Sequence, residues 1–308
     1  MMALSTISTP PKAPSSLKRL VKEHPLVVYF VMAFSISWIL WIPLVASAHG
    51  LLAGGNAFSY FHLLGSLGPL LAALIVTGIV GGTVGLRELG VRMVKWRVGL
   101  IWWVIALFGS AALYGLSAML LRLFSGLWPD ISQFGQTDEY PQIGLILFWI
   151  ANIALYGFGE ETGWRGFALP RLQNTHSALV ASLILSAFWA LWHVPLFLSL
   201  PNMMNMGIGG TVGWVLFIVT GSILLTWVYN STRGSILILA VFHGTLDITI
   251  NSPSPGALAT VMGVFFTVLG VLVLLVMGPA SLSRSGKQTI GAREPSRGGK
   301  IDHMEATV

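Results

Sequence analysis

The sequence predicts an all-α membrane protein, a polytopic bundle of about eight transmembrane helices. Of its 308 residues, 55% are hydrophobic and only 9% are charged, and the mean hydropathy is +0.79. Apolar stretches of about 17 to 25 residues, long enough to cross a bilayer, recur along almost the whole chain. The absence of cysteine excludes disulfides, thiolate metal sites and cysteine nucleophiles.

Eight apolar stretches define the predicted spans. The seventh is short, and no repeat of fixed period or soluble domain interrupts the series. We therefore expect one helical membrane unit over residues 25–280. Segments 1–24 and 281–308 are basic and polar and are predicted to be disordered. The spans cover roughly residues 26–47, 60–80, 98–121, 142–159, 178–200, 211–229, 234–250 and 257–278.

The distribution of charge predicts the orientation of these spans. If the N-terminus is cytoplasmic, every Lys and Arg except Arg122 lies on the cytoplasmic side, and Asp130, Asp138 and Glu139 lie on the opposite side. Cytoplasmic loops of membrane proteins carry such an excess of Lys and Arg. We expect a multi-pass protein of the plasma membrane with both termini cytoplasmic. The net charge of +6 then sets topology and meets anionic lipid headgroups, and it indicates no nucleic-acid partner.

The first polar segment follows the fourth predicted span and contains Glu160, Glu161 and Arg165. On a helix, Glu161 and Arg165 share a face at i, i+4, whereas Glu160 points away from Arg165. One carboxylate is thereby paired and the other is left free to act as a general base. The structural alternative is a salt bridge at the membrane interface.

The second polar segment places His193 among aromatic residues in the fifth predicted span. A lone His in a helix is more often packed than catalytic. However, Pro195 lacks a backbone N–H and its ring clashes with the carbonyl of Leu191, so the helix should kink or open beside His193. Irregular backbone at that depth needs protein or a water-filled cavity around it, and Trp189, at i−4 from His193, is placed to wall such a cavity.

The third polar segment places His243 and Asp247 at i, i+4 in the seventh predicted span. His243 lies about nine residues, or about 14 Å, from the cytoplasmic start of that span, which is too deep for a surface salt bridge. An ionisable pair at that depth is expensive. It either belongs to a functional site or is an internal polar clasp that fixes helix packing.

Taken in order, the three segments resemble the CAAX protease and bacteriocin-processing family (CPBP, or ABI) of intramembrane endopeptidases. The resemblance rests on Glu-Glu-x-x-x-Arg-Gly at 160–166, Leu-Trp-His at 191–193 and His-x-x-x-Asp at 243–247, and it covers about residues 142–250. The eight predicted spans also suit that family. Signatures of other intramembrane proteases, His-Glu-x-x-His, Gly-x-Gly-Asp and Gly-x-Ser-Gly, are missing from the sequence.

The resemblance implies hydrolysis of a peptide bond in a membrane-associated peptide or lipidated protein. It implies that Glu160 and His193 activate a water, that His243 and Asp247 stabilise the oxyanion, and that Glu161, Arg165 and Trp189 support them. CAAX-type cleavage, bacteriocin leader processing, self-immunity and cleavage of membrane-anchored regulators are all open as substrates. The active site is expected toward the cytoplasmic side.

Asp247 departs from the family, whose members often carry Asn there. An amide donates to an oxyanion, whereas an ionised carboxylate repels it. Asp247 is therefore protonated, orients His243 or binds a metal. A divalent ion such as zinc, held by His193, His243 and a carboxylate of Glu160 or Asp247, stays open as a cofactor.

Depth is a second difficulty for a single site. Counted from residue 178, His193 lies about 22 Å from the cytoplasmic face, whereas Glu160 falls near that face. Span five must begin deeper than predicted, span four must tilt or continue inward, or the residues do not share one site. The rival functions are a proton-coupled transporter, for which intramembrane Glu, His and Asp are equally typical, and a non-catalytic immunity or sorting scaffold.

Overall fold

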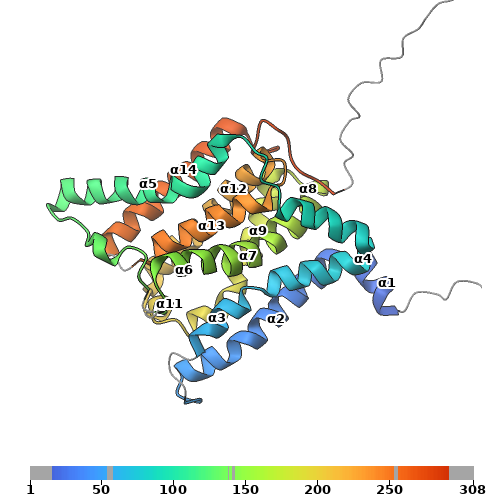
Figure 1. Cartoon of the computed structure of the whole chain (residues 1–308), viewed down its shortest axis with the longest axis horizontal. Coiled ribbons are helices and arrows are strands. Elements are labelled where there is room, and N and C mark those ends of the chain that lie inside the picture. The colour runs from blue at the N-terminus through green and yellow to red at the C-terminus, as the bar shows by residue number, and fades with distance from the viewer. Residues whose placement is uncertain (1–15, 54–57, 138, 141–142, 253–255, 291–308) are drawn as a thin grey trace, which may run out of the picture.

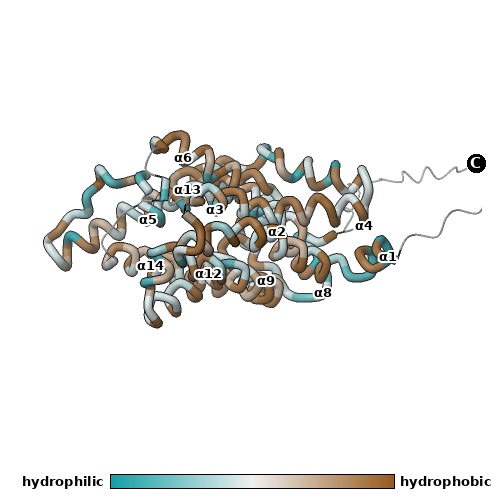
Figure 2. Tube along the Cα trace, turned by 90° about the horizontal axis from the view of Figure 1, so that it is seen from below, coloured by the Kyte–Doolittle hydropathy of each residue, from teal (hydrophilic) through white to brown (hydrophobic). Residues whose placement is uncertain are grey.

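The protein is all-helical in its computed structural model, which describes residues 16–53, 58–137, 139–140, 143–252 and 256–290. No strand occurs within these ranges. Long helices lie side by side in one bundle (Figure 1). Hydrophobic residues run along most of the helices, whereas α1 and the loop that leaves α5 contain hydrophilic residues (Figure 2). Many of the large hydrophobic side chains are exposed.

Among the described residues, five helical segments are long and apolar enough to cross a membrane, which agrees with a polytopic membrane protein. Two shorter apolar helices, α9 (Ala178–Trp192) and α13 (Ile236–Asn251), lie where the fifth and seventh spans are predicted. The count of eight spans stays a prediction. The five segments are α2 (Pro25–Ala48), α3 (Tyr60–Gly65) together with α4 (Gly68–Met93), α5 (Leu100–Ser125), α12 (Gly207–Ser231) and α14 (Gly256–Met277).

The fourth predicted span, 142–159, ends too early. The helix begins at Leu145 and continues to Thr175, so the Glu160–Glu161 motif lies in its middle and not at its end. Hydropathy falls after Gly159 because the residues that follow are polar. Other helices bury these polar residues, and a count of apolar residues does not register that burial. The path consists of α6 (Leu145–Ala151), the π-helix η3 (Asn152–Gly157), α7 (Phe158–Gly163), the π-helix η4 (Trp164–Ala168) and α8 (Leu169–Thr175).

The predicted break beside His193 is confirmed. Helix α9 ends at Trp192, and a separate short helix, α10 (Val194–Phe197), carries Pro195 in its first turn. Proline is tolerated there because the first N–H groups of a helix have no intrahelical partner. The fifth predicted span is therefore two helices with His193 at their junction. The short helix α11 (Pro201–Met204) follows them.

Glycines allow α13 to approach the α6–α8 path closely. A Cβ on Gly157 would lie 2.3 Å from the carbonyl oxygen of Ala240, and one on Gly244 would lie 2.6 Å from the backbone nitrogen of Ile153. Gly159 meets the Ser66 carbonyl in the same way, at 2.6 Å, just before α4. Small residues at helix crossings permit this contact between backbones in membrane proteins. The glutamates of α7 are thereby held between α4 and α13.

The segment predicted to be disordered at the N-terminus is helical over its last part. Helix α1 (Ser16–Glu23) packs against the bundle through buried Val21 and carries an exposed Arg19–Glu23 ion pair of 2.8 Å, so the prediction of disorder is wrong for these residues. At the other end of the chain, residues 281–290 lie against α8, where Gln173 Nε2 donates to the Gln288 carbonyl at 2.8 Å. Residues 1–15 and 291–308 of the predicted disordered segments lie outside the described part.

The 3₁₀ turn η2 (Ile131–Gln133) follows α5.

Candidate active site

The three polar segments line one cavity inside the bundle. Its volume is about 120 Å³, and its wall includes Glu160, Trp189, His193, His243 and Asp247. A water molecule occupies about 30 Å³ in the liquid, so the space suits a few waters among polar groups. A larger hollow of about 590 Å³ lies on the outer side of α2 and contains none of these five residues.

The difficulty of depth disappears because the α6–α8 path continues past the predicted boundary. Glu160 precedes the end of α8 at Thr175 by about 15 residues, and His193 follows the start of α9 at Ala178 by about 15 residues. At about 1.5 Å per residue, both lie about 22 Å from the turn between α8 and α9. The sequence left three alternatives open. The structure agrees with the alternative in which span four continues inward.

The two adjacent glutamates have different partners. Arg165 Nη1 donates to Glu161 Oε1 at 2.9 Å, and both side chains are completely buried. The alternative of a salt bridge at the membrane interface is therefore wrong. Glu160 is 4% exposed, and its Oε2 accepts a hydrogen bond of 2.7 Å from Trp189 Nε1. The structure has the predicted Glu161–Arg165 pair, and Glu160 faces the cavity.

Trp189 does more than wall the cavity, which is all that the sequence suggested. Its indole N–H donates to Glu160, and the Arg165 guanidinium lies 4.5 Å from its ring centroid. A cation over an indole face is attracted by the ring quadrupole. The same indole therefore touches both the free carboxylate and the buried Glu161–Arg165 pair.

His243 is held more closely by Glu161 than by its predicted partner. Its Nδ1 lies 2.8 Å from Glu161 Oε1, and because a carboxylate accepts, the imidazole donates. Its Nε2 lies 3.7 Å from Asp247 Oδ2, which is an ion-pair distance and too long for a hydrogen bond. Glu161 thus links Arg165 to His243, an interaction that sequence spacing gave no means to predict.

His193 lies at the junction of α9 and α10 with its proton position fixed by the backbone. Its Nδ1 is 2.7 Å from the Trp189 carbonyl oxygen, and because a carbonyl only accepts, Nδ1 is the protonated nitrogen. The ring packs edge-on against Trp192 and Trp214, at centroid distances of 4.9 and 5.3 Å. In the neutral imidazole Nε2 then carries the lone pair and can accept a proton.

Three further polar residues line the cavity that the sequence interpretation missed: His62 of α3, Tyr156 of η3 and Asn251 of α13. His62 Nδ1 lies 2.8 Å from Glu139 Oε1 and 3.1 Å from the Tyr156 hydroxyl. A lone His in an apolar stretch and a Glu in a distant loop share no spacing pattern, so no local signal connects them.

The metal site that the sequence left open stays a prediction. Among the residues described, no three His, Asp or Glu side chains lie together in a way that could hold a metal ion. The Nδ1 atoms of His193 and His243 are engaged by a carbonyl and a carboxylate, so their Nε2 atoms are the ones that could face an ion beside Glu160 or Asp247. Catalytic zinc usually has three protein ligands, and the mechanism proposed for these four residues uses no metal.

Comparison with known proteins identifies the class. Residues 142–249 match the family model of Rce1-like type II CAAX prenyl endopeptidases. The chain is also 28% identical, over 239 residues, to CAAX prenyl protease 2 of Methanococcus maripaludis, an alignment that covers 72% of this chain and 82% of the relative. With the apolar helices described above, these matches define an integral-membrane protease.

Residues 142–249 are thus similar to Rce1-like CAAX prenyl endopeptidases. The family resemblance predicted from the three motifs is thereby confirmed, as is the prediction of a protease. The matched segment contains the whole α6–α8 path and most of α13, and so includes Glu160, His193, His243 and Asp247. His62 and Glu139 lie outside it.

Proposed function

We propose that this chain is an intramembrane endopeptidase that cleaves a peptide bond of a prenylated protein with a CAAX-type C-terminus. The observation that carries the proposal is the single cavity in which the free carboxylate of Glu160 and the imidazole of His193 lie at the same depth. The similarity to CAAX prenyl protease 2 of Methanococcus maripaludis supports a prenylated substrate.

In the proposed mechanism, Glu160 and His193 activate a water molecule. The water adds its oxygen to the scissile carbonyl carbon, and Glu160 takes its proton with the help of the His193 Nε2 lone pair. Trp189 holds the Glu160 carboxylate through its indole N–H, and its backbone carbonyl orients His193. A surrounding wall of Trp rings keeps bulk water out, which strengthens these polar contacts.

His243 then stabilises the negative charge that develops on the carbonyl oxygen. Glu161 fixes its ring by accepting from Nδ1, and with both nitrogens protonated His243 is a cation whose Nε2, on the Asp247 side, donates to the oxyanion. Donors placed in advance around a developing oxyanion are commonly worth about 10² to 10³ in rate. Asp247 completes this part of the cavity, either as a neutral donor or by orienting His243.

An apolar hollow supports a lipid-bearing substrate. It has a volume of about 590 Å³ on the outer side of α2, and Pro195, two residues beyond His193, forms part of its wall. A prenyl chain that lies there on the lipid-facing surface would leave the attached peptide near the α9–α10 junction. The other lining residues are mainly apolar: Ser35, Trp38, Ile39, Ile42, Val45, Ala46, His49 and Leu51.

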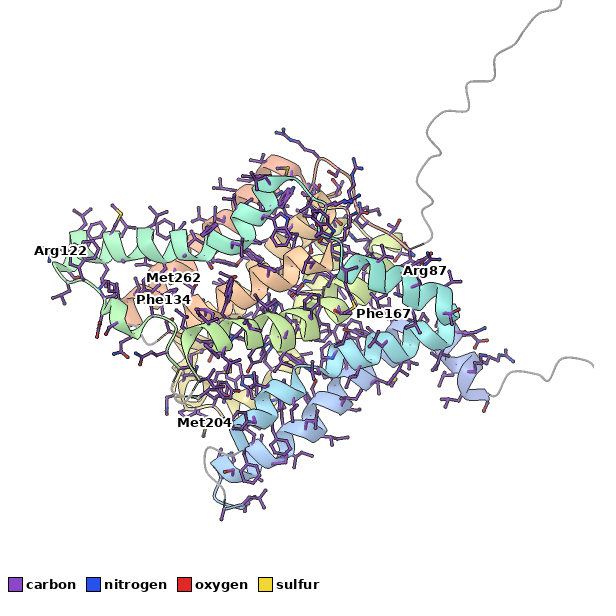
Figure 3. All side chains as sticks on the ribbon, in the orientation of Figure 1. Arg87, Arg122, Phe134, Phe167, Met204 and Met262 are labelled. Atoms are coloured by element: carbon purple, nitrogen blue, oxygen red, sulfur yellow. The ribbon has the colours of Figure 1, made fainter. Side chains whose placement is uncertain are left out.

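We further propose the predicted topology of eight spans in the plasma membrane, with both ends cytoplasmic. Arg122 and Arg87 lie at opposite ends of the bundle, as that topology requires (Figure 3). Helix α1 lies at the same end as α8, and residues 281–290 contact α8 (Figure 1). In this orientation a peptide that enters from the cytoplasmic side must reach about 22 Å inward, to the level of Glu160 and His193.

The decisive experiment measures cleavage of a prenylated CAAX peptide by purified protein in liposomes. Glu160→Gln and His193→Gln should each lower kcat/KM by about 10² to 10⁴, the usual contribution of general acid–base groups. His176→Gln is the matched control because His176, at the end of α8, hydrogen-bonds to Thr175 and is not part of the cavity wall. It should cleave like the native protein.

Two outcomes would contradict the proposal. Undiminished cleavage by Glu160→Gln and His193→Gln would remove the catalytic assignment, provided that both variants insert and elute as the native protein does. Equal cleavage of the same peptide with and without its prenyl group would remove the prenylated substrate while leaving the peptidase.

A further inference from the structure

The cavity has a polar wall that comes from outside the family-matched segment. His62, in the short helix α3, lines the cavity together with Glu160, His193, His243 and Asp247. The match spans residues 142–249, so neither His62 nor its partner Glu139 belongs to the motifs that identify the family. The roles proposed above make no use of this histidine.

The contacts of His62 leave one ring nitrogen for the cavity. Glu139 Oε1 accepts from His62 Nδ1 at 2.8 Å and from the Tyr140 hydroxyl at 2.8 Å. The Tyr156 hydroxyl lies 3.1 Å from the same Nδ1 and 3.3 Å from the Tyr140 hydroxyl. The side chains of His62 and Glu139 are only 14% and 22% exposed. Because Nδ1 is occupied, Nε2 is the nitrogen with which His62 can act on a bound molecule.

Hydrolysis of an amide requires a proton at the leaving nitrogen, and the residues assigned so far do not supply a separate donor. His193 keeps its Nδ1 proton on the Trp189 carbonyl, and both nitrogens of His243 face carboxylates. We propose that His62 is a catalytic acid of this cavity, whose Nε2 donates a proton to the leaving amine. The proposal rests on the endopeptidase function proposed above.

The proton balance closes without another reactant. Water bonds to the carbonyl carbon through its oxygen and gives one proton to Glu160. When the carbon–nitrogen bond breaks, its electron pair goes to nitrogen, which takes the proton of His62 Nε2 and leaves as a neutral amine. The carbonyl double bond reforms as a carboxylic acid. Glu160 then returns its proton to His62, and both groups are restored.

Glu139 gives His62 the arrangement that such a role needs. A carboxylate bonded to one imidazole nitrogen fixes the ring and its tautomer and stabilises the imidazolium form. The Tyr140 hydroxyl donates to Glu139 and holds that carboxylate in place, and the Tyr156 hydroxyl contacts both Tyr140 and His62. Glu139 also comes from the loop after α5, so it joins a distant part of the chain to the site.

The test compares two substrates of His62→Gln in liposomes. One is the prenylated peptide, and the other is an analogue in which the scissile amide is replaced by an ester of a phenol. A phenolate leaves without protonation, so only the amide depends on an acid. The variant should cleave the amide about 10² to 10⁴ times more slowly than the native protein and the ester at a nearly unchanged rate. His176→Gln should cleave both normally.

Each other result overturns the assignment in a recognisable way. Equal slowing of amide and ester would make His62 a structural residue, and an unchanged amide rate would give it no role. Glu139→Gln, which keeps an acceptor for Nδ1 but removes the charge, provides a second variant should His62→Gln misfold. It should slow the amide selectively, and a failure to do so would contradict the proposal. If the native protein cleaves neither substrate, the endopeptidase function itself fails.

Discussion

Among single residues, Trp189 contacts several groups of the candidate site at once. Its indole N–H holds Glu160, its carbonyl holds His193, and its ring face lies against the Arg165 guanidinium. From the sequence, Trp189 could be expected only to wall a cavity, because spacing along a helix indicates which residues share a face and not which groups they meet. Its contacts with Glu160 and Arg165 cross to another helix, and those depend on tertiary packing.

Asp247 is the residue for which the family motif gives the weakest guide. Its carboxylate lies 3.7 Å from His243 Nε2, close to where the oxyanion is proposed to form. An ionised carboxylate there repels the oxyanion, whereas an amide donates to it. We therefore expect Asp247→Asn to cleave the prenylated peptide at least as fast as the native protein. Asp247→Leu should lose about 10² to 10³ in kcat/KM. An Asn variant as inactive as the Leu variant would show that the carboxyl group itself is needed.

Among the elements, the α6–α8 path explains why the site was harder to predict than its residues. The sequence correctly placed Glu161 and Arg165 on the same face of a helix, because that pair depends only on helical spacing. It placed the helix end at residue 159, where apolarity stops. Two π-helices flank α7, and such segments often occur at functional sites. Neither they nor the burial of charged residues by α4 and α13 can be recognised from hydropathy.

The close contact of this path with α13 gives a prediction for its glycines. A methyl group on Gly157 or Gly244 meets backbone atoms at 2.3 and 2.6 Å, which do not yield as a flexible side chain would. Gly157→Ala and Gly244→Ala should each lower the stability by about 1 to 3 kcal/mol and reduce cleavage, because His243 moves away from Glu161. Thermal unfolding in detergent measures the change.

Gly115 of α5 is the matched control for that measurement. A Cβ there would meet no atom within 4 Å other than those of its own helix backbone, so Gly115→Ala should leave the melting temperature unchanged or raise it slightly, since alanine favours helix. Native-like melting of Gly157→Ala and Gly244→Ala would mean that α13 and the α6–α8 path are not packed as closely as described.

For the whole molecule, the sequence predicted the class of fold and the three motif segments, whereas the complete cavity required the structure. The class follows from composition and the motifs from local spacing. His62 and Glu139 are 77 residues apart in sequence, and each is unremarkable in its own segment. Their pairing depends on how the loop after α5 returns to α3, and no periodic pattern encodes such a contact.

The orientation in the membrane can be tested by labelling introduced cysteines, without background labelling of native ones, because the chain contains no cysteine. Ser125 ends α5 near Arg122, and Ser285 lies in the segment packed on α8; both are exposed. With both ends cytoplasmic, a membrane-impermeant maleimide should label Ser125→Cys in intact cells and Ser285→Cys only in inside-out vesicles. Cleavage of an added peptide by inside-out vesicles alone would support entry from the cytoplasmic side. Labelling of both variants from the same side would contradict the proposed topology, in which Arg122 and Arg87, at opposite ends of the bundle, lie on opposite sides of the bilayer.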